Sequence, residues 1–308
     1  MDPGKAFELF VKHLLINVGF SEVKSDGLYI YDGAPGKMIQ GLGESHNADV
    51  LLDPPVQTPF YSKTRLLIEC KNYRTKVGLN TVRSVLGLRE DINNFNIVDL
   101  TELKNRRQQN RHITPPIFDR YSYQVAIGAL NGFTVQAQKF ASTYHIPLLE
   151  FHHLPFWNRF YQAIDSRSPD YNYEYPEQSI ANRLCDLAND IGQHIAVAVT
   201  NSGQLLFLYH ITAGPIHFNH TYSLHWADPK TPWRLKSGEE EYLFQLPKAI
   251  LKSWLDKSTT ELDMKCQALY CKEEFLSNMV VYYKNHEYPE IKMISIDRSQ
   301  LNEALIHL

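Results

Sequence analysis

The stretch at residues 64–73 reads TRLLIECKNY and decides how the first half of the chain folds. Its aliphatic run at residues 66–68 predicts a buried strand, because such runs fill strands that are covered on both faces. Two charged residues, Glu69 and Lys71, follow the run at once. Side chains alternate along a strand, so these two project from one face while Cys70 points to the other.

A second short strand is predicted at residues 48–52, and Asp49 lies near its start. Nineteen residues separate Asp49 from Glu69. If the two strands pair, two carboxylates and the Lys71 ammonium converge. Charged groups are costly to bury unless they are paired or bind a metal. Asp49 and Glu69 then offer hard oxygen ligands for Mg²⁺ or Mn²⁺, and the backbone carbonyl of Cys70 adds another oxygen.

Hydrolysis of a phosphodiester bond is a chemistry that needs such a group. A metal ion polarises the phosphoryl oxygen and lowers the pKa of a bound water. Lys71 then orients that water or counters the charge that develops in the transition state. The alternative is an edge-strand pair of Glu69 and Lys71 unrelated to catalysis, because alternating charges are common on half-exposed strands.

The other segments of the first half predict an α/β architecture, with a mixed sheet flanked by helices. Apolar spacing and turn residues divide the segments between helices and strands. The strand–helix–strand order near the end of this half implies a right-handed crossover between parallel strands. The expected elements are helices at 4–19, 79–92 and 133–144, glycine-rich turns with short strands at 27–43, and strands at 121–130 and 146–151.

Four motifs follow one another in the first 151 residues. They are GKAFE at 4–8 on a helix that ends in Gly19-Phe20, GLGESHNADV at 41–50, LIECK at 67–71, and a helix-to-strand segment at 133–151 that contains IPLLE. In this order they resemble the PD-(D/E)XK nuclease superfamily, specifically its Mrr-like restriction endonuclease group. The resemblance implies a restriction-endonuclease-like domain at 1–165, with Asp49 and Glu69 as metal ligands and Lys71 as a catalytic group.

Three features depart from the Mrr-like pattern. Many members have Gln at the position of Glu69, so this chain has the commoner superfamily form. Ala48 stands where the group has Gly, and the segment 93–120 is longer than a minimal domain requires. These departures concern the choice of substrate more than the chemistry.

Glu8 is a further candidate catalytic residue, because related nucleases often carry an acid on the first helix that reaches the site. It would hold a second metal ion or a water. The alternative is a solvated glutamate in the first turn, which the helix dipole favours.

DNA is the expected partner, and four basic residues are candidates for contacts with its phosphates. The first half, residues 1–165, has 18 Lys and Arg against 16 Asp and Glu, a balance of +2, whereas residues 166–308 have 13 against 18, a balance of −5. Surface solubility explains such residues as well. The candidates are Lys76 and Arg83 after the Lys71 strand, and Arg106 and Arg107 in a basic run.

The second half is predicted to be a smaller α+β domain at 170–308, after a polar connection at 165–179. A hairpin is expected at 194–211. The tryptophans of this half, Trp226, Trp233 and Trp254, are expected in the core rather than on a base-stacking surface. Target recognition, dimerisation or regulation by a ligand or partner protein are the roles considered. The other expected elements are helices at 179–191, 247–256 and 298–306, and strands at 221–226, 240–246, 278–284 and 291–297.

The composition excludes several classes of protein. No run approaches the roughly 20 apolar residues that cross a bilayer, so no membrane association is expected. The four cysteines are scattered and form no zinc pattern, which favours free thiols in a reducing, cytoplasmic compartment.

The sequence therefore predicts a Mg²⁺-dependent endonuclease in restriction or phage defence, for which Mn²⁺ can substitute. The rivals are a nuclease gated by a ligand or partner, and a non-catalytic nucleic-acid binding module. A homodimer and two sequential cuts both remain open.

Overall fold

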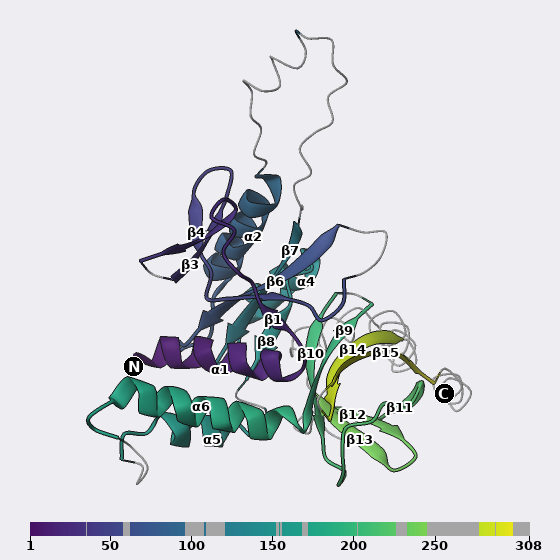
Figure 1. The fold of residues 1–308 in the computed structure, drawn as a ribbon. Helices are drawn as coiled ribbons and strands as arrows, with labels where there is room; N and C mark the ends of the chain where they lie inside the picture. The colour runs from purple at the N-terminus through teal and green to yellow at the C-terminus, as the bar shows by residue number, and fades with distance from the viewer. Residues whose placement is uncertain are drawn as a thin grey trace.

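The structure is a computed structural model of the chain, and it is mixed α/β with a five-stranded sheet and a closed barrel (Figure 1). Among the described residues, no helix combines the length and apolar composition that a membrane crossing requires. The described residues are 1–34, 36–57, 62–95, 108, 121–151, 154, 156–167, 172–201, 203–225, 233–244, 277–286 and 288–297.

The five-stranded sheet has β6 at its centre, in the order β1-β5-β6-β7-β8. Strand β6 pairs antiparallel with β5 and parallel with β7, and β7 pairs parallel with β8. The mixed sheet predicted from the sequence is therefore confirmed. Its strands are β1 (Ser21–Glu22), β5 (Val50–Asp53), β6 (Lys63–Lys71), β7 (Tyr121–Ala129) and β8 (Leu148–Glu150).

Helices cover both faces of this sheet. Helix α1 (Pro3–Asn17) packs on the face that contains Ile68 and Cys70. Helices α2 (Leu79–Asn94) and α4 (Val135–Thr143) cover the opposite face. The expected alternation along β6 is thus present, with Cys70 in the α1 core and its two charged neighbours on the other side.

A small sheet of three strands leads the chain into Asp49. It consists of β2 (Ile30–Gly33), β3 (Gly36–Gln40) and β4 (Ser45–Asn47). The loop between β3 and β4 closes around the Asp91 carboxylate of α2. A Cβ atom at Gly41 would lie 2.6 Å from the backbone carbonyl oxygen of Glu44 and would also clash with the Asp91 carboxylate, so only glycine fits there.

Two further helices extend the α1 layer. Helix α5 (Trp157–Ile164) was not predicted, and α6 (Pro176–Gly192) begins three residues before its expected start. In Figure 1, α6 lies beside α1, and residues of both helices share one hydrophobic cluster. That cluster spans the expected boundary at 165–170, and the division into two domains stays a prediction.

Seven strands form a closed barrel, in the order β10-β13-β12-β11-β15-β14-β9. The prediction of an α+β domain did not anticipate this closure or strand β12, and the helices expected at 247–256 and 298–306 lie outside the described residues. The strands are β9 (Ile195–Thr200), β10 (Leu205–His210), β11 (Thr221–His225), β12 (Trp233–Ser237), β13 (Glu240–Phe244), β14 (Asn278–Asn285) and β15 (Tyr288–Ile296).

The β9–β10 hairpin is the wall that the barrel shares with the helices. Val197 and Phe207 belong to the α1 cluster, whereas Ala198 and Leu208 belong to the barrel core. The hairpin predicted at 194–211 is therefore present, and because both of its faces are buried its strands are almost wholly apolar rather than alternating.

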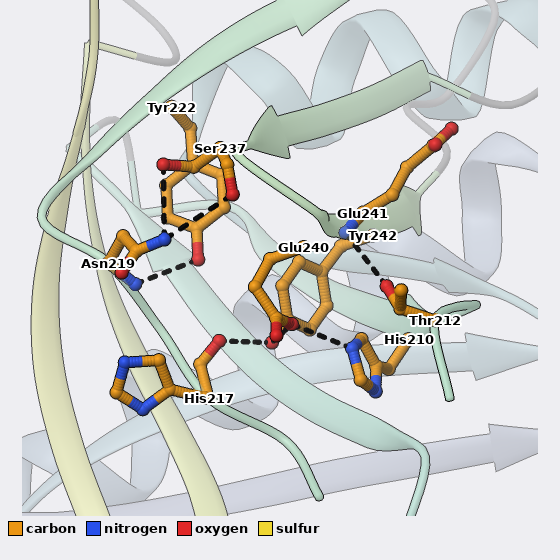
Figure 2. A network of polar contacts seen from close by, with 9 residues as sticks. All are labelled: His210, Thr212, His217, Asn219, Tyr222, Ser237, Glu240, Glu241 and Tyr242. Carbon is orange, nitrogen blue, oxygen red and sulfur yellow. Dashed lines mark hydrogen bonds and ion pairs between the residues drawn. The ribbon is translucent and has the colours of Figure 1, made fainter. Parts of the chain in front are cut away.

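Polar side chains inside the barrel bond to one another, as Figure 2 shows. His210 Nε2 lies 2.8 Å from Glu240 Oε2, and the Tyr242 hydroxyl donates to the His217 carbonyl over 2.6 Å. The Tyr242 ring stacks on Phe218, with centroids 4.3 Å apart. These interactions link β10 and β13 with the segment at 217–218.

Candidate active site

Strand register brings Asp49 alongside Glu69. Val50 pairs with Ile68 in the antiparallel β5–β6 ladder, so one further step along each chain sets Asp49 opposite Glu69. Residues opposite each other on antiparallel strands project from the same face. Lys71, two residues beyond Glu69, projects from that face as well.

Three side chains meet where β6 runs past the start of β5. The Cys70 backbone N–H donates to Asp49 Oδ2 over 2.8 Å, which fixes that carboxylate. Lys71 Nζ donates to Glu69 Oε2 over 2.9 Å and lies 3.7 Å from Asp49 Oδ2. The structure therefore brings Asp49, Glu69 and Lys71 together, as the sequence predicted.

Burial and the neighbouring charges shift the pKa values of Glu69 and Lys71. Glu69 is 9% exposed, and burial together with the nearby Asp49 carboxylate raises its pKa. Burial alone would lower the pKa of Lys71, but the Glu69 and Asp49 carboxylates outweigh it and raise that pKa. Lys71 is thus held as a cation between two carboxylates.

Glu8 approaches the same group from α1. Burial, and then the charge of Asp49, raise the pKa of Glu8 to about 7, against an opposing effect of Lys71. A glutamate that only faced solvent would not respond to these charges. The structure therefore sets Glu8 within electrostatic range of the three predicted residues.

Cys70 can contribute only through its backbone. Its thiol is buried against α1, where burial raises its pKa well above the ordinary value. In an extended strand the N–H and C=O of one residue point to the same side. Because the Cys70 N–H points to Asp49, its carbonyl oxygen faces that side too.

The donor set fits a hard divalent cation. Among the described residues, no group of three or more His, Cys, Asp and Glu side chains is gathered closely enough to form a metal centre by itself. Mg²⁺ does not need one, because it usually binds through one or two carboxylates and completes its shell with waters and substrate phosphates. Asp49 and Glu69, with the Cys70 carbonyl, meet that requirement.

A histidine–aspartate pair beside the site was not predicted. His46 Nε2 lies 2.7 Å from Asp91 Oδ2, and the Gly43 N–H donates to Asp91 Oδ1 over 2.7 Å. His46 is close enough to Glu69 to lower its pKa, although burial dominates. Asp91 lies 45 residues after His46, so no short sequence motif indicates that the two residues pair.

Of the four basic residues expected to contact DNA, the structure describes two, Lys76 and Arg83. Lys76 is exposed in the loop that follows β6. Arg83 is exposed on α2, with its guanidinium carbon 5.8 Å from the centroid of the Phe140 ring. No contact joins either residue to Asp49, Glu69 or Lys71 within the described part of the chain. Arg106 and Arg107 lie outside the described residues.

Comparisons with known proteins do not identify a family for this chain. No family model matches the chain, and no curated protein matches it. The chain is similar to a crystal structure of a protein of unknown function, AF1548, with a TM-score of 0.32 and 13% identity. The likeness covers 59% of this chain and 95% of that one. Likeness at this level carries no argument about activity.

Proposed function

We propose that the chain is a Mg²⁺-dependent endonuclease of the PD-(D/E)XK superfamily that hydrolyses DNA phosphodiester bonds in restriction or phage defence. One observation supports this most strongly. Asp49, Glu69 and Lys71 share one face at the point where β6 runs past β5, with Lys71 Nζ within 3.7 Å of both carboxylates. Two buried carboxylates against one ammonium leave an excess of negative charge, which a bound divalent cation would offset.

Each residue has a role in this proposal. Asp49 and Glu69 bind Mg²⁺, or Mn²⁺ in its place, together with the Cys70 carbonyl. The bound metal supplies Lewis acidity and a water of lowered pKa. Lys71 orients the attacking water or offsets the negative charge of the phosphoryl transition state. Glu8 is an auxiliary acid that holds a water at the edge of the cluster.

DNA would reach this site across the end of the sheet where Lys71 lies. Lys76 and Arg83, both exposed, then serve as phosphate contacts. Arg106 and Arg107 are proposed for the same role on the basis of sequence alone. A cytoplasmic location follows from the proposed defence role.

A plasmid-nicking assay tests the proposal directly. Wild-type protein should nick or linearise DNA with Mg²⁺ and not with EDTA. Lys71→Ala should cleave about 10²–10³-fold more slowly, the usual cost of losing one charge-stabilising group. The matched control is Lys236→Ala, on an exposed barrel strand, which should retain full activity. Equal rates for wild type and Lys71→Ala would remove the proposed mechanism.

A second candidate is a nuclease gated through the barrel by a ligand or partner protein. Its support is the packing of α1, which carries Glu8, against α6, whose end leads into barrel strand β9. Purified protein would then cleave only after a cell extract is added, and removing Lys71 would abolish that induced activity.

A further inference from the structure

A cavity of about 290 Å³ lies toward the end of the sheet opposite Lys71. Four aromatic residues line it together with polar side chains, among them Arg65 of β6. The volume is near the lower limit of small-molecule sites, which suits a single heteroaromatic ring or a nucleoside. The aromatic lining residues are Tyr29, Phe95, Tyr121 and Tyr123.

Arg65 is a buried cation held in a fixed orientation on this wall. Its side chain is 8% exposed, and Nε donates to Asp53 Oδ1 over 3.1 Å. Its guanidinium carbon lies 3.5 Å from the centroid of the Tyr121 ring, and Nη1 lies 3.5 Å from the Tyr123 hydroxyl. A guanidinium has five N–H donors. Bonds to described residues use two of them, so donors remain for a ligand.

Two of the neighbouring polar side chains, Asp26 and Asn93, are bonded to the backbone and hold the wall in place. Asp26 Oδ1 accepts from three backbone N–H groups, those of Leu28, Tyr29 and Ile30. The Asn93 side chain bonds both the N–H and the carbonyl oxygen of Tyr123. Arg65 is the buried cation of this lining, and it presents a planar donor fork beside aromatic faces.

We propose that this cavity binds a guanine base, with Arg65 donating to its O6 and N7 and the aromatic residues packing on its ring. A guanidinium fork matches those two acceptors, and aromatic side chains stack on nucleobases. Asp53 and Asp26 offset the charge of Arg65, which disfavours a bare anion and favours a neutral acceptor edge. The base would come from a free nucleoside or from an unpaired guanine in DNA.

This site is independent of the proposed cleavage chemistry. Arg65 and Glu69 are four residues apart on one strand, which sets them about 13 Å apart. Binding can therefore be measured with the metal chelated, so that loss of nuclease activity and loss of base binding are separate results.

Calorimetric titration of the full chain in EDTA tests the proposal, with guanosine, adenosine and inorganic phosphate as probes. Guanosine should bind at least tenfold more tightly than adenosine, and phosphate should not bind. A parallel titration with an oligonucleotide duplex that carries one unpaired guanine separates the two sources of the base.

Two variants make the result specific. Arg65→Lys keeps the charge but loses the fork, and should weaken binding about tenfold or more. Ser62→Trp, at an exposed position that lines the cavity, should fill it and abolish binding even if Arg65→Lys fails to fold. The control is Arg234→Lys on the barrel, which should bind like wild type. Phosphate binding alone, equal binding of adenosine, or no effect of Ser62→Trp on either guanine source would overturn the proposal.

Discussion

The end of the sheet and the interior of the barrel both hold charged side chains, but they arrange them in opposite ways. At the sheet, Lys71 is paired with the carboxylates of Asp49 and Glu69, Glu8 lies within electrostatic range of them, and the pKa values of Glu8 and Glu69 are raised. In the barrel, His210 is matched by Glu240.

This difference distinguishes a group of side chains suited to bind a cation from one that stabilises the fold. In the barrel, hydrogen bonds to His210 Nε2 and from the Tyr242 hydroxyl offset part of the cost of burial, although His210 Nδ1 has no hydrogen-bond partner among the described residues. The sheet cluster has more negative charge than Lys71 neutralises, and it would be relieved by a divalent cation. This difference favours the proposal that the reaction belongs to the sheet and that the barrel network has a structural role.

The largest expected effect tests the wall that joins the two regions. Phe207→Ala on β10 removes a ring packed on Phe151, with centroids 5.4 Å apart. Loss of such a buried ring should lower the free energy of unfolding by about 3–5 kcal/mol. Urea denaturation followed by circular dichroism measures it. Tyr288→Ala, at a position 75% exposed, is the control and should change little. A loss no greater than that of the control would show that this wall is not a shared core.

Metal binding should stabilise the sheet and leave the barrel unaffected. Ca²⁺, a probe that occupies oxygen sites, should raise the free energy of unfolding by about 2.7 kcal/mol at a concentration 100 times its Kd. Asp49→Asn should remove most of this gain, whereas Glu240→Gln in the barrel should keep it. Thermal denaturation with and without Ca²⁺ measures both, and an equal gain in both variants would place the metal elsewhere.

Within the barrel, breaking one pair should affect stability and not cleavage. Glu240→Ala leaves Nε2 of the fully buried His210 side chain without its partner, which should cost about 1–3 kcal/mol. Plasmid cleavage at a temperature where the variant remains folded should match wild type. A selective loss of cleavage in folded protein would connect the barrel to the reaction.

The smallest effect concerns the pH dependence of the metal-free protein. The pKa of Glu8 is about 7 in the folded chain, against 4.5 as the ordinary value. Because the folded state holds this proton more tightly, stability falls as pH rises from 4.5 to 7. Solvent screening limits the change to about 1 kcal/mol. Glu8→Gln should flatten this part of the profile in urea titrations and be the more stable protein at pH 8. An unchanged slope would place Glu8 away from the cluster.

Much of the candidate site could be predicted because its geometry is local. Alternation along one strand puts Glu69 and Lys71 on one face, and the pairing of two neighbouring strands adds Asp49. The mixed sheet followed from apolar runs and the helices between them. The pairing of His46 with Asp91 could not be predicted from the sequence, because only the tertiary fold brings these two residues together.

The barrel was missed for a related reason. Its closure depends on pairs such as Thr221 with Ser295, which lie far apart in the sequence. Individual strands were predicted by their alternating residues, but alternation does not specify which edge closes on which. Helix α5 is only eight residues long, about two turns, so its apolar spacing repeats too few times to mark a helix in the sequence.

A crystal soaked in Mn²⁺ measures the central claim most directly. Anomalous scattering should show one ion bound to carboxylate oxygens of both Asp49 and Glu69, with Lys71 displaced from at least one of them. The account would be contradicted if Mn²⁺ at saturating concentration left these oxygens bonded to Lys71 and bound elsewhere in the molecule.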